Sequence, residues 1–242
     1  MRWLVEGLSR AKGTYLAPIL AILFLGIFIS VGNCFEERWV SIDGVSNIRD
    51  IGGYVTDDGI VKKGVIYRSG DLANIKPAGV EKLKELGIKT VVDLRNEPEM
   101  SKMDTLLADA DIKVIKLPMK RDKLRDKADF YRRIIVLSRK SLTKLLTITS
   151  DKNNLPLVIF DDDGVHEVEV ATMFLLDVIG VKSEDILNDY MLSNKHGANL
   201  KREWGEYIVN YFEEYGGIEL YLRNILKISP TVVNSIKRNL IK

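Results

Sequence analysis

The sequence predicts an α/β fold: a mostly parallel central sheet flanked by helices, a helical C-terminal part, and one membrane helix near the N-terminus. Short β-branched runs bounded by turn residues indicate strands, and helical patterns lie between them. After the last such run, which ends at Phe160, the chain reads as helices to its end. Because strands that alternate with helices are typical of parallel sheets, these observations favour one α/β domain.

The first element is an apolar segment at residues 15–32, YLAPILAILFLGIFISVG, which contains no charged side chain. As a helix it would be about 27 Å long, close to the lower limit for spanning a membrane. Arg2, Arg10 and Lys12 precede it, and basic flanks stay on the cytoplasmic side. We therefore expect a single-pass membrane protein.

The domain boundaries follow from this segment. Residues 1–14 are expected to form a basic cytoplasmic tail, residues 33–40 a juxtamembrane linker, and residues 41–242 a globular domain outside the cytoplasm. Ser30 and Gly32 are small residues at a spacing that suits a signal peptidase. Secretion after cleavage of a signal sequence is therefore the alternative.

Within the domain, four β-branched runs are predicted as strands: Val65 to Arg68, Thr90 to Leu94, Lys113 to Leu117, and Leu157 to Phe160. Between the strands, one helix is expected to begin at Pro77 and end at Gly87, and a second, basic helix to run from about Asp129 to Thr149. The C-terminal part is predicted to contain five helices, over Val168–Ile179, Ser183–Ser193, Leu200–Tyr215, Ile218–Leu226 and Pro230–Ile241.

Composition excludes several kinds of protein. Cys34 is the only cysteine, so a disulfide framework is impossible, and two histidines add too few ligands for a zinc site of the Cys/His type. The formal net charge is +2, which gives no support to nucleic-acid binding. We expect no nucleic-acid partner.

Fold class also predicts where a ligand should bind. In parallel sheets, ligands lie beyond the carboxyl ends of the strands, where a loop leads into a helix N-terminus. The turn after the Leu157–Phe160 strand fits this rule, because FDDDGVHEVEVA passes from an apolar run into a helical pattern. This turn is the candidate site.

Five sequence blocks resemble the bacterial and archaeal tyrosine-phosphatase family of the cysteine-dependent, dual-specificity-like type. The blocks follow the family's order: NIRDIGGY (Asn47–Tyr54), VKKGVIYRSGDL (Val61–Leu72), LGIKTVVDLRNEPE (Leu86–Glu99), ILNDYMLSNKH (Ile186–His196) and YGGIELYLRNIL (Tyr215–Leu226). The resemblance implies a tyrosine-phosphatase-like fold. It also implies that the candidate turn takes the place of the phosphate-binding loop, H-C-x-x-G-x-x-R-T-G.

The loop departs from the family at the positions that carry chemistry. Asp161 stands where the family has its nucleophilic cysteine, Glu167 where it has the arginine that clamps phosphate, and Phe160 where it has histidine; Gly164 is retained. The resemblance implies that the missing thiolate attacks phosphorus while the missing guanidinium holds the phosphate oxygens. We therefore assign no catalytic residue, and Asp161, Gly164 and Glu167 are degenerate loop positions.

Electrostatics argues in the same direction. A carboxylate about 4 Å from a phosphate oxygen costs roughly 4 kcal/mol per charge pair at an effective dielectric constant near 20. Five acidic residues and no lysine or arginine lie between Asp161 and Glu169, so we expect the loop to repel phosphate.

Six residues in the resembling blocks are predicted to form a binding framework that braces the loop: Arg49, Asp50, Arg68, Ser69, Asp93 and Arg95.

Two cation-dependent alternatives remain. LVIFDDDGV also resembles the first motif of haloacid-dehalogenase-type phosphotransferases, in which Asp161 would be the nucleophile, Asp163 the general acid, and Mg²⁺ would offset the charge. That family places the motif near its start and follows it with further strands, whereas only helical patterns follow here. The other alternative is a bare Mg²⁺ or Ca²⁺ site made by Asp161, Asp162, Asp163 and Glu167.

The sequence thus predicts a membrane-anchored pseudophosphatase that binds an unknown protein or an anionic ligand without hydrolysing it. An active Mg²⁺-dependent phosphomonoesterase that uses Asp161 is the alternative. A third possibility is a structural relic whose acidic loop holds a cation for stability alone. The catalytically inactive form needs no cofactor.

Overall fold

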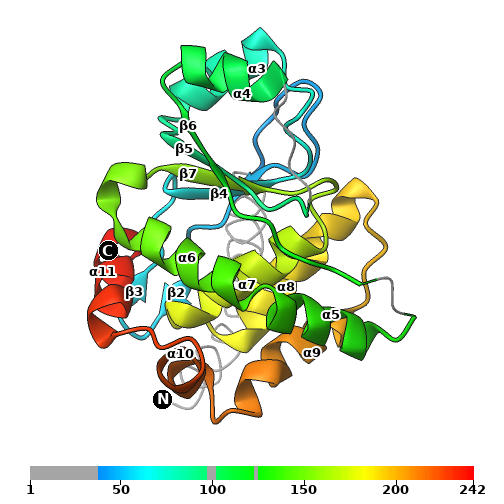
Figure 1. Cartoon of the computed structure of the whole chain (residues 1–242), viewed down its shortest axis with the longest axis vertical. Coiled ribbons are helices and arrows are strands. Elements are labelled where there is room, and N and C mark those ends of the chain that lie inside the picture. The colour runs from blue at the N-terminus through cyan, green and yellow to red at the C-terminus, as the bar shows by residue number, and fades with distance from the viewer. Residues whose placement is uncertain (1–37, 97–101, 123–124) are drawn as a thin grey trace, which may run out of the picture. The chain divides into compact units, whose positions relative to one another are not determined.

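The computed structural model describes residues 38–96, 102–122 and 125–242. A five-stranded sheet in the order β1-β4-β7-β5-β6 forms its centre (Figure 1). The strands are β1 (Arg49–Asp50), β4 (Ile66–Ser69), β5 (Thr90–Asp93), β6 (Lys113–Lys116) and β7 (Leu157–Phe160). The pairs β4–β7, β7–β5 and β5–β6 are parallel, and only β1 runs antiparallel to its neighbour. The prediction of a mostly parallel sheet is confirmed.

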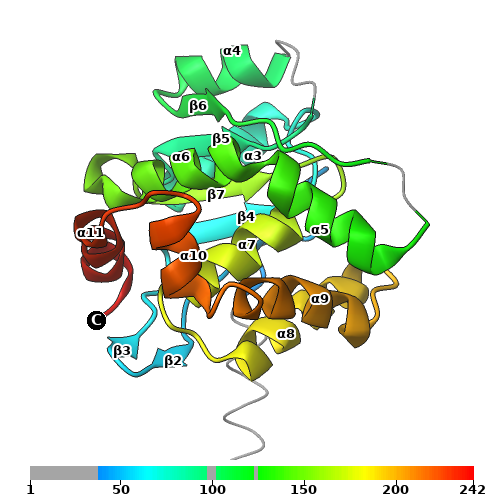
Figure 2. The ribbon, with the colours of Figure 1, turned by 60° about the horizontal axis from the view of Figure 1, so that its bottom comes forward.

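Helices cover both faces of the sheet (Figures 1 and 2). On one face lie α3 (Pro77–Glu85) and α4 (Lys102–Asp109), whose apolar side chains pack with alternate sheet residues. A larger group covers the other face: α5 (Lys127–Leu137), α6 (Arg139–Ser150), α7 (Glu167–Val178), α8 (Ser183–Leu192), α9 (Arg202–Glu213), α10 (Ile218–Asn224) and α11 (Pro230–Leu240). Short 3₁₀ turns cover Lys152–Asn154 and Ser193–His196.

Strand β7 lies between two hydrophobic cores, one on each face of the sheet, and contributes side chains to both. Its four residues are fully buried, and successive side chains point to opposite faces of the sheet. Leu157 and Ile159 accordingly join the core beneath α5 to α11, whereas Val158 and Phe160 join the core beneath α3 and α4. A continuous apolar run is what such a central strand requires.

Strand register positions the candidate site. Ser69 of β4 and Asp93 of β5 each pair with Phe160 of β7, so the three strands end at the same level. The turn that follows Phe160 therefore leaves the sheet between the ends of two neighbouring parallel strands. This is the position at which the fold class places ligands.

The structure corrects two features of the predicted fold. The single basic helix expected from Asp129 to Thr149 is two helices, α5 and α6, which meet at Ser138. The junction is stabilised by the Ser138 hydroxyl, which accepts a hydrogen bond of 2.9 Å from the backbone N–H of Lys120. Four further elements were not predicted: helix α4, strand β1, and the small hairpin of β2 (Val55–Thr56) and β3 (Gly59–Ile60). The three strands have two residues each, and strands of that length show no periodicity.

The predicted membrane segment at residues 15–32 and most of the predicted linker at 33–40 lie outside the described residues. Among the residues that are described, no helix is both long enough and apolar enough to cross a membrane. Residues Val40–Lys242 form one compact unit.

Candidate active site at the turn after strand β7

The candidate site is the turn of residues 161–166, which joins β7 to α7. Gly164 lies at its centre with φ +70°, in the left-handed region that favours glycine. A Cβ atom placed there would lie 2.7 Å from the backbone nitrogen of Gly70 and 2.9 Å from its Cα. The turn thus packs directly on the backbone at the end of β4, which explains why this loop keeps its glycine.

Asp161 is buried and binds the turn that contains it. Its carboxylate accepts hydrogen bonds from the backbone N–H groups of Asp163 at 3.1 Å, of Gly164, and of Val168 at 2.9 Å. Val168 is the second residue of α7, and N–H groups in the first turn of a helix have no partner within the helix. The donors that a helix N-terminus offers to an anion are therefore directed at a side chain of the same loop.

The protonation of Asp161 is balanced between burial and these donors. Burial, followed by the neighbouring charge of Asp163, raises the pKa of Asp161 to about 6, while the hydrogen bonds from Val168 and Gly164 oppose that rise. The guanidinium of Arg68 opposes it as well. Asp161 is consequently a carboxylate at neutral pH.

Glu167 begins α7 and is also nearly covered, with 3% of its surface exposed. Its Oε2 atom lies 3.2 Å from a guanidinium nitrogen of Arg121, which also approaches the Asp163 carboxylate at 3.6 Å. Burial, and then the charge of Asp161, raises the pKa of Glu167 to about 8 against the opposing effect of Arg121. The acidic turn therefore receives compensating charge from Arg121, which follows β6, and sequence reasoning did not single out that residue.

Beneath the turn, Arg68 of β4 is completely buried. Its guanidinium forms two parallel bonds with the Glu169 carboxylate, at 2.5 and 2.7 Å, and donates a third, of 2.7 Å, to the carbonyl of Gly164. Such a fork-to-fork pair fixes geometry as well as charge. Arg68 thus joins Glu169 of α7 to the Gly164 carbonyl of the turn.

Arg49 acts one step away from the turn. It bonds Asp189 at 3.1 Å and the amide oxygen of Asn47 at 2.5 Å, and Asn47 in turn donates to the Gly164 carbonyl at 2.7 Å. Although burial opposes ionisation, Arg49 and Arg68 hold the pKa of Asp189 below its usual range. Sequence reasoning did not single out Asn47 and Asp189, but both lie in the blocks that carry the family resemblance.

The other framework residues form hydrogen bonds at the ends of the strands. Asp93 binds Arg95 through two bonds of 2.9 and 2.7 Å, and the Arg95 guanidinium lies 5.1 Å from the centre of the Phe160 ring. The Asp50 carboxylate accepts hydrogen bonds from the backbone N–H groups of Gly52, after β1, and Gly64, before β4. The Ser69 hydroxyl donates a hydrogen bond to the carbonyl of Gly70. These bonds organise the ends of β1, β4 and β5.

The geometry does not support the predicted cation site. Among the described residues, no group of three or more histidine, cysteine, aspartate or glutamate side chains is arranged to hold a metal ion. Asp161, Asp162, Asp163 and Glu167 therefore do not converge as ligands. Asp161 points its oxygens at backbone N–H groups, Glu167 faces Arg121, and Asp162 is exposed to solvent.

Residues 40–242 match the sequence pattern of the tyrosine phosphatase family. The chain belongs to the tyrosine phosphatase family. A protein of Cupriavidus necator that is named as a candidate tyrosine-protein phosphatase is 26% identical over 181 residues, which cover 67% of this chain and 66% of that relative. The alignment thus spans just under two thirds of the relative's length.

Two solved structures are similar to this chain to different degrees. The core catalytic domain of the PP-IP phosphatase SIW14 from S. cerevisiae superposes with a TM-score of 0.50 and 16% sequence identity, covering 77% of this chain and 97% of that domain. The P. aeruginosa protein TpbA gives a TM-score of 0.37 over 64% of this chain and 89% of that protein, at 17% identity. The SIW14 domain supports the mixed α/β fold with a mostly parallel sheet, whereas family membership rests on the sequence match over residues 40–242.

Proposed function

We propose that this protein is a catalytically inactive member of the tyrosine phosphatase family, anchored in a membrane through residues 15–32, whose domain outside the cytoplasm binds a protein partner or an anionic ligand. One observation carries the proposed inactivity. The Asp161 carboxylate already accepts the backbone N–H groups of the loop, at the position where the family resemblance expects a nucleophilic thiol.

Phosphate binding in the inherited manner meets two obstacles. A free phosphate must compete for the loop donors with a carboxylate that the chain holds beside them at high effective concentration. At the position where a bidentate guanidinium is needed, Glu167 offers a carboxyl group whose pKa burial raises to about 8, so it supplies no positive charge to a phosphate. Both obstacles act on substrate binding, before any chemical step.

The Mg²⁺-dependent alternative requires Asp161 to reach a phosphorus atom as a nucleophile. Only 1% of Asp161 is exposed, and its oxygens are directed at the backbone of the turn. The geometry therefore favours a structural role for Asp161 over a nucleophilic one.

Hydrolysis assays of the full chain test the proposal. p-Nitrophenyl phosphate and phosphotyrosine peptides are supplied with Mg²⁺, with Ca²⁺ and with a chelator, and we expect no turnover above background in any condition. Asp161→Asn is compared with Asp162→Asn, which changes an exposed neighbour in the same way. Turnover that disappears in Asp161→Asn but persists in Asp162→Asn would establish the aspartate-dependent enzyme instead.

A further inference from the structure

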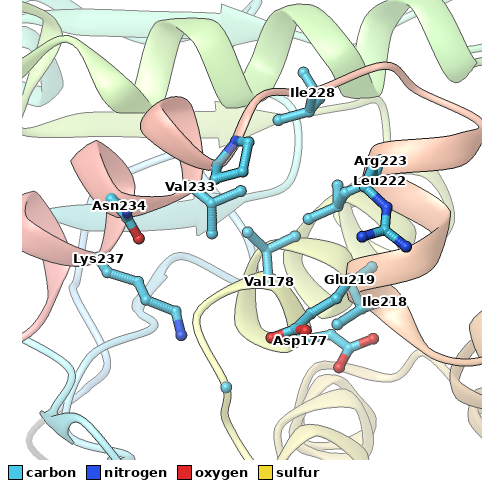
Figure 3. A pocket seen from close by; sticks show the side chains of 12 residues that line it. Asp177, Val178, Ile218, Glu219, Leu222, Arg223, Ile228, Val233, Asn234 and Lys237 are labelled. Carbon is cyan, nitrogen blue, oxygen red and sulfur yellow. The ribbon is translucent and has the colours of Figure 1, made fainter.

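A second possible site lies at the other end of α7. A cavity of about 310 Å³ opens between the last turn of α7, helix α10 and helix α11 (Figure 3). Its volume falls within the range of small-molecule sites in proteins, which is about 300 to 1,000 Å³. Because α7 begins at the acidic turn and ends here, the cavity is separate from the site of the proposed function.

One side of the cavity is apolar. Val178 of α7, Leu222 of α10, Ile228 of the following loop and Val233 of α11 line it. Val178 and Leu222 are buried, whereas Ile228 and Val233 are partly exposed. This wall suits a hydrocarbon or aromatic group, because covering exposed apolar surface is favourable at about 25 cal/mol per Å².

The polar side of the cavity contains two carboxyl groups, those of Asp177 and Glu219. Asp177 and Glu219 project toward the same end of the cavity in Figure 3. Within the part of the chain that the structure describes, no hydrogen bond or ion pair engages either carboxylate. Burial, and then the charge of Glu213, raises the pKa of Asp177 to about 7, as expected for a carboxylate without a cation beside it.

The two basic residues at the cavity have neighbours of their own. Lys237 forms an ion pair of 2.8 Å with Asp58. Arg223 is exposed, and its Nε atom donates to the side chain of Asn224 at 3.4 Å. The carboxylate of Asp177 is therefore the half-buried charge that a ligand can compensate.

Helix position makes Asp177 unusual. It lies in the last turn of α7, which contains no basic residue, and the C-terminal end of a helix carries partial negative charge. An acidic side chain there is destabilising, whereas a cation is stabilising. The partial negative charge of the helix end and the carboxyl group of Asp177 thus both favour a cationic ligand.

We propose that this cavity binds a small organic amine, with the protonated amino group at Asp177 and the hydrocarbon part against the apolar wall. Charge and shape agree on this class: an anion would meet Asp177 and Glu219, and a purely polar cation would leave the apolar wall uncovered. Small-molecule sites in proteins commonly combine a mostly apolar lining with a few polar groups that orient the ligand.

Three probes of similar shape and different charge test the proposal: 2-phenylethylamine, 2-phenylethanol and 3-phenylpropionate. Each is titrated into the full chain in nanodiscs of neutral phospholipid, and methyl nuclear magnetic resonance signals of Val178 and Leu222 report local binding. We expect the amine to bind about tenfold more tightly than the alcohol, as for a hydrogen bond to a charged group, and the propionate to bind more weakly than both.

Variants separate charge from shape. Asp177→Asn should weaken amine binding about tenfold without changing alcohol binding, and Val233→Phe should fill the cavity and abolish both. Asp109→Asn, an exposed aspartate on α4, is the matched control and should change neither. Equal affinity for amine and alcohol, or amine binding that survives Asp177→Asn, would overturn the proposal.

Discussion

At the residue scale, Asp161 determines what the loop can bind. Its buried carboxylate accepts hydrogen bonds from three backbone N–H groups, as a bound anion would. One of these donors, the N–H of Val168, lies in the first turn of α7, so the carboxylate also caps the start of that helix. At the position where the family resemblance places a reactive cysteine, Asp161 thus forms hydrogen bonds within the turn.

Replacing the two acidic residues at the family's cysteine and arginine positions should make the turn receptive to phosphate. The change is Asp161→Ala with Glu167→Gln, which frees the backbone donors and removes two of the acidic groups while Arg121 remains. We expect the melting temperature of this variant to rise with added inorganic phosphate, because ligands that bind the folded state stabilise it. The wild-type chain should show no such rise. A wild-type chain that responds as strongly as the variant would contradict the proposed occupation of the loop.

Arg68 should be costly to remove. Arg68→Met leaves Glu169 buried without its partner, and breaking a buried ion pair costs about 3 to 5 kcal/mol. Urea denaturation measures that loss. The double variant Arg68→Met with Glu169→Gln removes both charges and should recover part of the free energy of unfolding. Equal destabilisation of the single and double variants would mean that charge compensation is unimportant here.

At the scale of elements, the turn between β7 and α7 depends on close backbone contact. Gly164→Ala introduces a Cβ atom 2.7 Å from the Gly70 nitrogen, in addition to the strain of a positive φ. Gly180→Ala is the matched control, since Gly180 also has a positive φ of +84° but nothing lies within 4 Å of the added atom. We expect about 1 kcal/mol of destabilisation for Gly180→Ala and at least about 2 kcal/mol more for Gly164→Ala, by thermal or urea denaturation. Similar losses in the two variants would show that the contact with β4 is loose.

Sequence patterns predicted the helices and strands in which apolar residues recur at a regular spacing. The four strands β4 to β7 and the C-terminal helices lie within about two residues of their expected limits, because apolar runs and turn residues mark them. The junction at Ser138 was missed, since the amphipathic pattern continues from α5 into α6 and no glycine or proline interrupts it. The structure shows a tertiary hydrogen bond at that break, from the Lys120 N–H to the Ser138 hydroxyl, which no local pattern encodes.

The candidate site was predicted less completely than the fold. Its position follows from the strand-to-helix turn, and Arg68, one of the predicted framework residues, donates a hydrogen bond to the Gly164 carbonyl. The pairing of Glu167 with Arg121 was not, because 46 residues separate them and no local pattern links the two. The orientation of Asp161 was also missed, since sequence shows that a carboxylate is present and not which donors it meets.

At the scale of the whole molecule, buried carboxyl groups determine how stability should depend on pH. The pKa values of Asp161, Asp177 and Glu167 are raised to about 6, 7 and 8, in each case chiefly by burial. Groups with raised values keep their protons in the folded chain after the unfolded chain has lost them. The free energy of unfolding should therefore fall as the pH rises from about 4 to about 8.

Asp177→Asn isolates one part of this pH dependence. The groups around Asp177 are Glu213 on α9, Glu219 and Arg223 on α10, and Lys237 on α11. Urea denaturation at several pH values between about 5 and about 8 should show a flatter profile for the variant than for the wild type. Asp109→Asn should leave the profile unchanged. A wild-type stability that increases steadily toward pH 8 would contradict the raised pKa values.

The carboxylate in the turn after β7 has a consequence for signalling. An active phosphatase alternates between vacant and substrate-loaded forms, and a partner that senses the loop can distinguish them. In the proposed function the anion is the Asp161 side chain itself, so we expect changes in phosphate around the protein to leave the loop unchanged. A partner that docks near this turn meets one constant surface, which suits a scaffold better than a sensor.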